Sequence, residues 1–290
     1  RKGGRNVPAA VGVAVLLIGL VALSLIFNKV YFALLVAVAI CVALWELAGA
    51  FARRAVGLPL LPLWVGTFGA VACAYVIGPE GLLAAVFATS GACMVWGFTT
   101  HAQYDYGTAL EIAHPEDPRT YAHDVVRRSR TLEAAAAIFS VCYLPFLAGF
   151  AVMLLAQHQG VGKIVALIAL PALSDTGGWL AGITFGKHPM APKISPKKTW
   201  EGFVGSVIAT TIGTGAVLWL LGGTLWATPL LALAVVISAT LGDLGESLIK
   251  RDLGLKDMSN LLPGHGGLLD RIDSILTTAP VLYIASVLAL

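Results

Sequence analysis

Acidic and basic side chains gather in a short stretch toward the end of this sequence. Asp243, Glu246 and Lys250 are spaced i, i+3 and i+7, which puts them on one face of a helix. Asp270 and Asp273 lie three residues apart, so they would also share a helix face. Carboxylates beside apolar segments need a partner or a cation, and Mg²⁺ prefers oxygen ligands that it often shares with substrate phosphates. The pattern therefore indicates a magnesium site that serves phosphate chemistry.

A glycine-rich turn separates the two acidic sets. The turn Gly264-His265-Gly266-Gly267 leads toward a helix start, where free N–H groups and the helix dipole would favour a phosphate. Lys250, Arg251 and Lys256 add positive charge nearby. His265 would handle a phosphate or a proton, or would serve as a structural hydrogen-bonding group. A charge such as Arg251 could also simply end a helix at the membrane surface.

A second basic cluster is Ser195-Pro196-Lys197-Lys198-Thr199-Trp200-Glu201-Gly202. Pro196 keeps the chain extended, and Thr199 can cap the helix that follows. The adjacent lysines at the start of that helix would form a phosphate site through charge and dipole together. An anchor at the membrane interface is the alternative, because Trp200 suits that position.

Two further carboxylates lie in apolar segments. Asp175 is placed inside an otherwise uncharged stretch, and intramembrane carboxylates are functional hypotheses by default. The neighbouring glycines 177, 178, 182 and 186 could alternatively serve close helix packing. Glu46 stands at the end of another apolar stretch, and we expect it to pair with Arg53 or Arg54 rather than to take part in catalysis.

The elements that must position these groups follow from composition. The 290 residues are 58% hydrophobic and 12% charged, with a mean hydropathy of +0.84, whereas soluble domains carry about 25% charged residues. A net charge of +3 gives no support to a nucleic-acid partner. We expect an all-α, polytopic integral membrane protein of about nine helices, with spans near residues 7–27, 30–50, 58–77, 81–99, 133–156, 162–184, 202–222, 226–246 and 274–290. The first is expected to be a retained helix rather than a signal peptide.

The basic residues predict an orientation for this bundle. If the N-terminus is cytoplasmic and the C-terminus external, 17 of the 19 lysines and arginines fall on the cytoplasmic side. The long polar loops near 100–131, 185–201 and 247–273 then share that side, where binding and chemistry are usually carried. We divide the chain into an N-terminal scaffold, 1–131, with transmembrane helices and a cytoplasmic loop, and a C-terminal catalytic transmembrane domain, 132–290.

At these residues the sequence resembles a known family. The pattern Ser247-x2-Lys250-Arg251-x4-Lys256-Asp257-x-Ser259-x2-Leu262-Pro263-x-His265-Gly266-Gly267-x2-Asp270-Arg271-x-Asp273 resembles the signature of the phosphatidate cytidylyltransferases, also called CDP-diacylglycerol synthases. Residues 195–202 resemble a second block of that family, and Asp175 with Gly182 and Phe185-Gly186-Lys187 resembles a third. Gly178-Trp179 departs from the third block, where Ala-Tyr is expected.

The resemblance implies transfer of CMP from CTP to phosphatidic acid, which gives CDP-diacylglycerol and pyrophosphate. It also implies a two-metal centre of Mg²⁺ and a possible K⁺, with Asp243 and Asp270 as metal ligands by similarity. A homodimer in the cell (inner) membrane is implied as well, with its active site facing the cytoplasm and membrane lipids around it.

The residues and the resemblance together define an expected site. The expected catalytic residues are Asp243, Asp270, Lys250, Asp273 and Glu246. The expected substrate-binding residues are Lys197, Lys198, Ser195, Thr199, Arg251, Lys256, His265, Gly266, Gly267, Arg271, Asp175 and Glu201.

Two other functions fit a polytopic membrane protein with buried carboxylates. A CDP-alcohol phosphotransferase would show a DGxxAR block followed by GxxxDxxxD, and this chain has neither. An ion-coupled secondary transporter would place its charges near the bilayer midplane in paired halves, whereas here they gather at the expected cytoplasmic ends.

Overall fold

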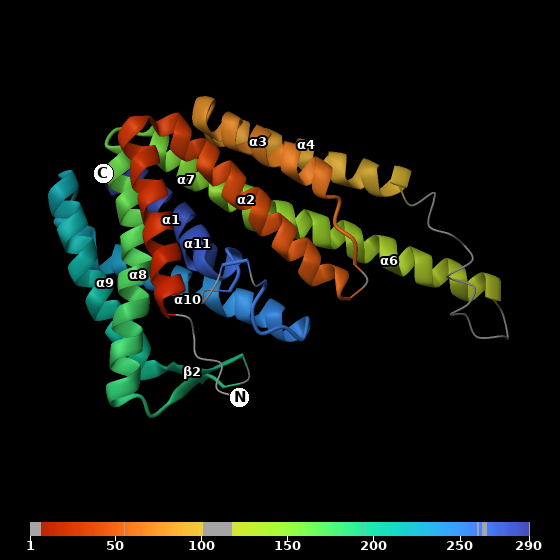
Figure 1. Ribbon diagram of the computed structural model, residues 1–290. Helices are drawn as coiled ribbons and strands as arrows, with labels where there is room; N and C mark the ends of the chain where they lie inside the picture. Colours follow the sequence, from red (N-terminus) through yellow and green to blue (C-terminus); the bar gives the residue numbers. More distant parts are fainter. Residues whose placement is uncertain are drawn as a thin grey trace.

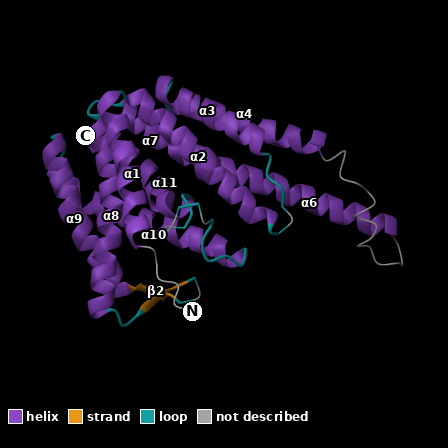
Figure 2. Ribbon diagram, in the orientation of Figure 1, coloured by secondary structure: helices purple, strands orange, loops and turns teal. Residues whose placement is uncertain are grey.

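The computed structural model describes residues 7–54, 56–100, 118–192, 194–259, 261–262 and 266–289, and it is a bundle of long helices with one small hairpin (Figures 1 and 2). The elements in chain order are α1 (Val7–Phe27), α2 (Lys29–Ala52), α3 (Leu60–Val76), α4 (Pro79–Thr100), α6 (Pro118–Val141), the π-helical turn η2 (Cys142–Phe146), α7 (Leu147–Ala156), α8 (Gly160–Phe185), β1 (Pro189–Ala191), β2 (Ser195–Thr199), α9 (Trp200–Leu221), the short 3₁₀ turn η3 (Leu225–Ala227), α10 (Thr228–Asp252) and α11 (Leu269–Ala289).

The expected class, an all-α protein that crosses the membrane several times, is confirmed. Within the described ranges, seven helical segments are long and apolar enough to cross a membrane, and Gly12–Phe27 and Leu60–Val76 are shorter apolar helices. Each corresponds to one of the nine expected spans. Two helices reach further than their apolar runs predict: α10 ends at Asp252, and α11 begins at Leu269. The charged residues of the site therefore lie on helical turns that extend the apolar segments.

The segment α6–η2–α7 is one span with a π-helical turn in its middle. Pro145 lies inside that turn. Proline has no N–H to donate and its ring collides with the carbonyl four residues earlier, and a single widened turn accommodates both effects. The expected domain boundary at residue 131 falls within α6 and coincides with no break in the helix.

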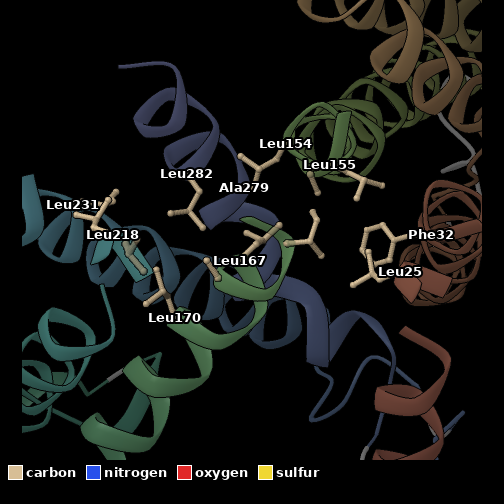
Figure 3. Close-up of a cluster of buried hydrophobic side chains, with 14 residues drawn as sticks. Leu25, Phe32, Leu154, Leu155, Leu167, Leu170, Leu218, Leu231, Ala279 and Leu282 are labelled. Carbon is tan, nitrogen blue, oxygen red and sulfur yellow. The ribbon is translucent and has the colours of Figure 1, made fainter. Parts of the chain in front are cut away.

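Buried leucines hold the centre of the bundle. Leu154 and Leu155 of α7 and Leu167 and Leu170 of α8 converge with Leu282 of α11 (Figure 3), and all five are nearly or fully buried. Close packing rather than water exclusion is the main attraction between helices in lipid. Large apolar side chains on the outside, such as Ile212, 71% exposed, form the surface that the lipid tails would contact.

Glycines bring α8 and α9 into close contact. A Cβ added at Gly177 would lie 2.5 Å from Ala209 Cβ, and one at Gly205 would lie 2.3 Å from Ala181 Cβ. Small residues of this kind let two helix backbones approach in a membrane. The packing role that the sequence left open for Gly177 is therefore confirmed.

Between α8 and α9 the chain forms the antiparallel hairpin β1–β2, at the lower end of the bundle in Figure 1. Pro189 pairs with Thr199, and Trp200 N donates to His188 O at 3.0 Å. The Glu201 carboxylate closes the hairpin, with Oε1 2.6 Å from His188 Nδ1. Thr199 caps α9 by accepting a hydrogen bond from Gly202 N, as the sequence predicts.

Candidate active site

The hairpin meets α10 at an ion pair. The ammonium of Lys198 lies 2.5 Å from Asp243 Oδ2. Asp243 also accepts a long hydrogen bond, 3.5 Å, from Ser247 Oγ one turn later. A second contact joins the same elements, since Arg251 Nε donates to Ile194 O at 2.9 Å. The structure thus brings together the two clusters that the sequence singled out separately.

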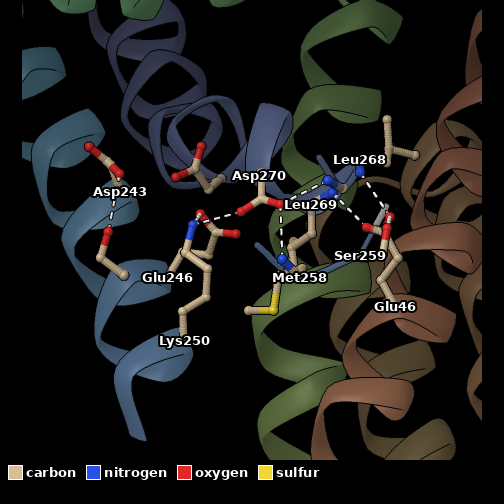
Figure 4. A network of polar contacts seen from close by, with 12 residues as sticks. Glu46, Asp243, Glu246, Lys250, Met258, Ser259, Leu268, Leu269 and Asp270 are labelled. Atoms are coloured by element: carbon tan, nitrogen blue, oxygen red, sulfur yellow. Dashed lines mark hydrogen bonds and ion pairs between the residues drawn. The ribbon is translucent and has the colours of Figure 1, made fainter. Parts of the chain in front are cut away.

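Lys250 joins α10 to α11. Its ammonium lies 2.6 Å from Asp270 Oδ1 and 3.2 Å from Glu246 Oε2 (Figure 4). The side chains of these carboxylates are only 6% and 1% exposed. Buried charges are stable only when paired and hydrogen-bonded, so Lys250 holds the first turn of α11 against the last turns of α10.

Three carboxylates lie close enough to share a cation. Asp243, Glu246 and Asp273 each offer one oxygen, and these oxygens lie within 4.8 Å of one another. Glu246 Oε1 is buried and has no hydrogen-bond partner within the described part of the chain. Anions this close repel one another, and a donor set made of oxygen alone suits a hard divalent ion such as Mg²⁺. The residues present therefore fit the expected metal.

Asp270 has a different set of contacts from this trio. Besides Lys250, it accepts hydrogen bonds from Met258 N at 3.0 Å and Gly267 N at 2.9 Å. The prediction that Asp243 and Asp270 are the metal ligands stays a prediction. Asp243 belongs to the trio, and Asp270 is engaged by protein donors.

The glycine-rich turn is closed by its own backbone. Leu262 and Gly266 exchange two hydrogen bonds, of 2.9 and 3.1 Å, and Gly266 has a φ of +84° that favours glycine. We expected the N–H groups of Gly266 and Gly267 to be free for a phosphate. In the structure the first donates to Leu262 O and the second to Asp270, so that expectation is not met. His265 lies outside the described residues.

The interpretation of Glu46 as a partner of Arg53 or Arg54 is wrong. Its carboxylate is buried, 2% exposed, and accepts hydrogen bonds from Ser259 Oγ, Leu268 N and Leu269 N (Figure 4). Arg54 instead donates to Asp252 O at 2.6 Å. The signal that could have identified Glu46 was its carboxylate near the end of an apolar helix, which is itself a functional hypothesis.

Tyr143, in the π-helical turn, is a second residue that the sequence did not single out. Its hydroxyl is buried and lacks a hydrogen-bond partner among the residues that the structure describes. Its ring packs against the apolar cluster that includes Leu269 and Leu276 of α11, the helix that carries Asp270 and Asp273. Buried hydroxyls are usually bonded, and π-helical turns are frequent at functional sites. The hydroxyl therefore marks a place where a ligand, a water or an ion would bind.

Lys197 lines two cavities of the site. The first, which we call the cationic cavity, has a volume of about 310 Å³, and none of the described residues that line it is acidic. Its polar lining is Ser195, Lys197, Ser247, Lys250, Arg251 and Lys256. The second, which we call the mixed cavity, has a volume of about 250 Å³. Its lining includes Asp175, Trp179, Lys197, Lys198, Thr199, Phe203 and Asp243.

Most of the expected substrate-binding residues line one of these two cavities. Besides Gly266 and Gly267, two of the described residues lie elsewhere: Glu201 binds His188 at the base of the hairpin, and Arg271 is exposed in the first turn of α11. Their expected contacts with substrate stay predictions.

Comparisons with known proteins identify the family of the chain. Residues 8–289 match the profile of a family described as the cytidylyltransferase family. The phosphatidate cytidylyltransferase of Mycobacterium leprae is 37% identical over 283 residues, which cover 97% of this chain and 88% of the relative. That of Mycobacterium tuberculosis strain H37Rv is 38% identical over 287 residues, 98% of this chain and 83% of the relative. The protein of the same name from Staphylococcus aureus strain COL is 38% identical over 155 residues, 53% of this chain and 59% of the relative. The chain therefore belongs to the cytidylyltransferase family of enzymes.

Proposed function

We propose that this chain transfers CMP from CTP to phosphatidate, giving CDP-diacylglycerol and pyrophosphate, at the cytoplasmic face of the cell (inner) membrane. The observation that carries the proposal is the junction at Lys250, which lines the cationic cavity and binds two carboxylates, that of Asp270 and that of Glu246, a member of the acidic trio. A nucleotidyl transfer needs this combination, because its substrates are anionic and the reaction depends on positioning and charge neutralisation.

The cationic cavity suits the triphosphate of CTP. Lys197, Lys250, Arg251 and Lys256 bring four positive charges to one space. Arginine binds phosphate oxygens in a fork, and lysine acts as a point charge. The hydrogen bond from Arg251 to Ile194 O holds the hairpin wall of the cavity in place.

Asp243, Glu246 and Asp273 would hold Mg²⁺, which when bound supplies charge neutralisation to phosphoryl oxygens. The possible K⁺ comes from the family resemblance alone. Lys250, between Glu246 and Asp270, keeps the first turn of α11 beside this cluster. The burial of Glu246 and Asp273 limits the access of water, which would compete with the lipid as nucleophile.

The mixed cavity suits the lipid phosphate. Trp179 and Phe203 provide an apolar wall, and Lys197 and Lys198 provide positive charge. An oxygen of the phosphatidate monoester would attack the α-phosphorus of CTP, and the bond from that phosphorus to the β-phosphate oxygen would break. The nucleophile is already an anion, so no general base is required. Lys197 lines both cavities, which places one cation beside both substrates.

The orientation and the assembly are part of the proposal. The basic residues favour a cytoplasmic N-terminus and an external C-terminus. With that orientation, CTP reaches the site from the cytosol and phosphatidate from the inner leaflet. The homodimer is proposed from the family resemblance.

The test is an assay of the purified protein in detergent with CTP, phosphatidate and Mg²⁺, in which CDP-diacylglycerol and pyrophosphate are both measured. We expect Asp243→Asn and Asp270→Asn each to lower the rate by about 10–100-fold, because the first variant loses a metal ligand and the second loses the charged partner of Lys250. Asp252→Asn is the matched control, because Asp252 is exposed at the end of α10.

Each alternative predicts a different outcome, either in this assay or in a parallel one with liposomes or with CDP-diacylglycerol and an alcohol as substrates. If the Asp243 and Asp270 variants form as much CDP-diacylglycerol as the wild-type protein, neither residue holds the metal. Absence of CTP turnover, with ion flux in liposomes, would favour the transporter. Consumption of CDP-diacylglycerol together with an alcohol would favour the phosphotransferase.

A further inference from the structure

We propose that Glu46 of α2 is a positioning residue for the transfer reaction, which it serves by holding two segments that lead into α11, residues 258–259 and 267–269 (together called the loop), so that Asp270 meets Lys250. The inference rests on the proposed function, and it assigns a role in the site to a helix of the N-terminal half.

Three hydrogen bonds attach this loop to Glu46. Oε1 accepts from Ser259 Oγ at 2.5 Å and from Leu268 N at 2.9 Å, and Oε2 accepts from Leu269 N at 2.8 Å. Leu269 is the first residue of α11. N–H groups at a helix start have no partner within the helix, and a negative charge is favourable there. A side chain more than 200 positions earlier in the sequence therefore caps the helix that carries Asp270.

Asp270 binds the same loop at the neighbouring residues. It accepts from Met258 N and Gly267 N, next to the Ser259 and Leu268 groups that bind Glu46 (Figure 4). Each end of the loop is thus held by both carboxylates at once. Without Glu46, Ser259 and Leu268 would lose their hydrogen-bond acceptor. The adjacent amides of Met258 and Gly267, which bind Asp270, would then be held less firmly, and the geometry of the Asp270–Lys250 contact would no longer be fixed.

Gly267 shows how closely the loop passes between the two carboxylates. A Cβ added there would lie 3.1 Å from each Glu46 carboxylate oxygen and 2.9 Å from Asp270 Oδ2. A side chain at this position would require Glu46 or Asp270 to shift, so the loop passes in direct contact with both carboxylates.

The docking of α2 does not depend on Glu46 alone. Leu44 and Leu47 of α2 are fully buried in one apolar cluster with Leu269 and Leu276 of α11. This packing would keep the two helices together without the carboxylate. Replacement of Glu46 is therefore expected to affect the site more than the bundle.

The experiment compares Glu46→Gln with Ser259→Ala and with the matched control Glu80→Gln, because Glu80 is exposed in the first turn of α4. CDP-diacylglycerol formation gives kcat and the KM for each substrate, and thermal unfolding in detergent reports the fold. We expect Glu46→Gln to lower kcat by about tenfold or more, which is typical of lost outer-shell partners. The KM for CTP and the unfolding temperature should stay close to those of Glu80→Gln. Ser259→Ala should lower kcat less, and the double variant should equal Glu46→Gln rather than the product of the two effects.

The inference is overturned if Glu46→Gln keeps the kcat of the control, or if its loss of activity matches its loss of folded protein. Should Glu46→Gln fail to fold, Ser259→Ala decides, and a wild-type kcat in that variant overturns the inference. If the wild-type protein and Glu46→Gln form CDP-diacylglycerol with the same kcat, the inference is refuted and the proposed function stands. A wild type that makes no CDP-diacylglycerol refutes the proposed function and this inference together.

Discussion

The Lys198 ammonium lies 2.5 Å from the Asp243 carboxylate and thereby fixes the hairpin to α10. Both side chains are partly exposed, 25% and 35%, so the pair lies at the edge of the carboxylate cluster. Asp243 also belongs to the trio that fits a cation, and Lys198 lines the mixed cavity. The pair therefore connects the expected metal site to the expected lipid phosphate.

Replacement of this lysine should lower activity more than stability. We expect Lys198→Ala to reduce the rate of CDP-diacylglycerol formation by at least about tenfold, because a charge at the reacting phosphates is lost, while the contribution of a part-exposed ion pair to folding is only about 0–1 kcal/mol. Lys198→Arg should recover part of the rate because it keeps the charge. The control is Lys29→Ala, which removes a lysine that donates to Gln157 O. Equal rates for Lys198→Ala and Lys29→Ala would contradict the assignment.

The acidic trio and the pair Asp243 and Asp270, which the family resemblance implies, differ in which residues hold the metal ion. They therefore predict different effects of single substitutions on metal affinity. If Asp243, Glu246 and Asp273 hold the ion, Glu246→Gln should weaken Mn²⁺ binding, measured by electron paramagnetic resonance without substrates, by about tenfold or more. Asp270→Asn should then bind Mn²⁺ nearly as well as wild type, since Asp270 is occupied by Lys250 and two amides. The reverse result, with binding lost only in the Asp270 variant, would support the pair and would require Lys250 to release Asp270.

Removal of the Tyr143 hydroxyl should lower activity without lowering stability. Its hydroxyl is buried without a partner within the described ranges, and an unsatisfied buried polar group costs about 1–3 kcal/mol. Tyr143→Phe should therefore unfold at the same or a higher temperature. Its kcat should fall, because the hydroxyl would donate to a bound ligand beside the carboxylates. Phe139→Leu, which alters the ring stacked on Tyr143 and keeps the hydroxyl, serves as the comparison. An unchanged kcat in Tyr143→Phe would show that the hydroxyl has no part in the reaction.

The α8–α9 contact should be the part of the bundle most sensitive to small additions. Gly205→Ala would place a methyl group 2.6 Å from Gly177 O and 2.3 Å from Ala181 Cβ. Such overpacking costs about 1–3 kcal/mol, so the unfolding temperature in detergent should fall. Gly91→Ala in α4 meets open space and should leave it unchanged. Equal unfolding temperatures for the two variants would mean that α8 and α9 can move apart to accommodate the methyl group without loss of stability.

The spans were predictable because each is an uncharged apolar run, and Asp243, Glu246 and Lys250 were predictable as one face because helical spacing is local. The contacts that organise the site are not local. Lys250 binds Asp270 across 20 positions and Glu46 binds Leu269 across 223, and no periodicity reports such distances. For the same reason, Glu46 was assigned to the wrong partner, and the amides of Gly266 and Gly267 were expected to be free.

The widened turn at Cys142–Phe146 sets the rotation of α7 relative to α6. One residue corresponds to about 100° around a helix axis. A deletion of a single residue before Leu147 would turn Leu154 and Leu155 away from the core that they fill with α8 and α11. A change in the number of residues of this span should accordingly be tolerated less than a single substitution on its exposed face.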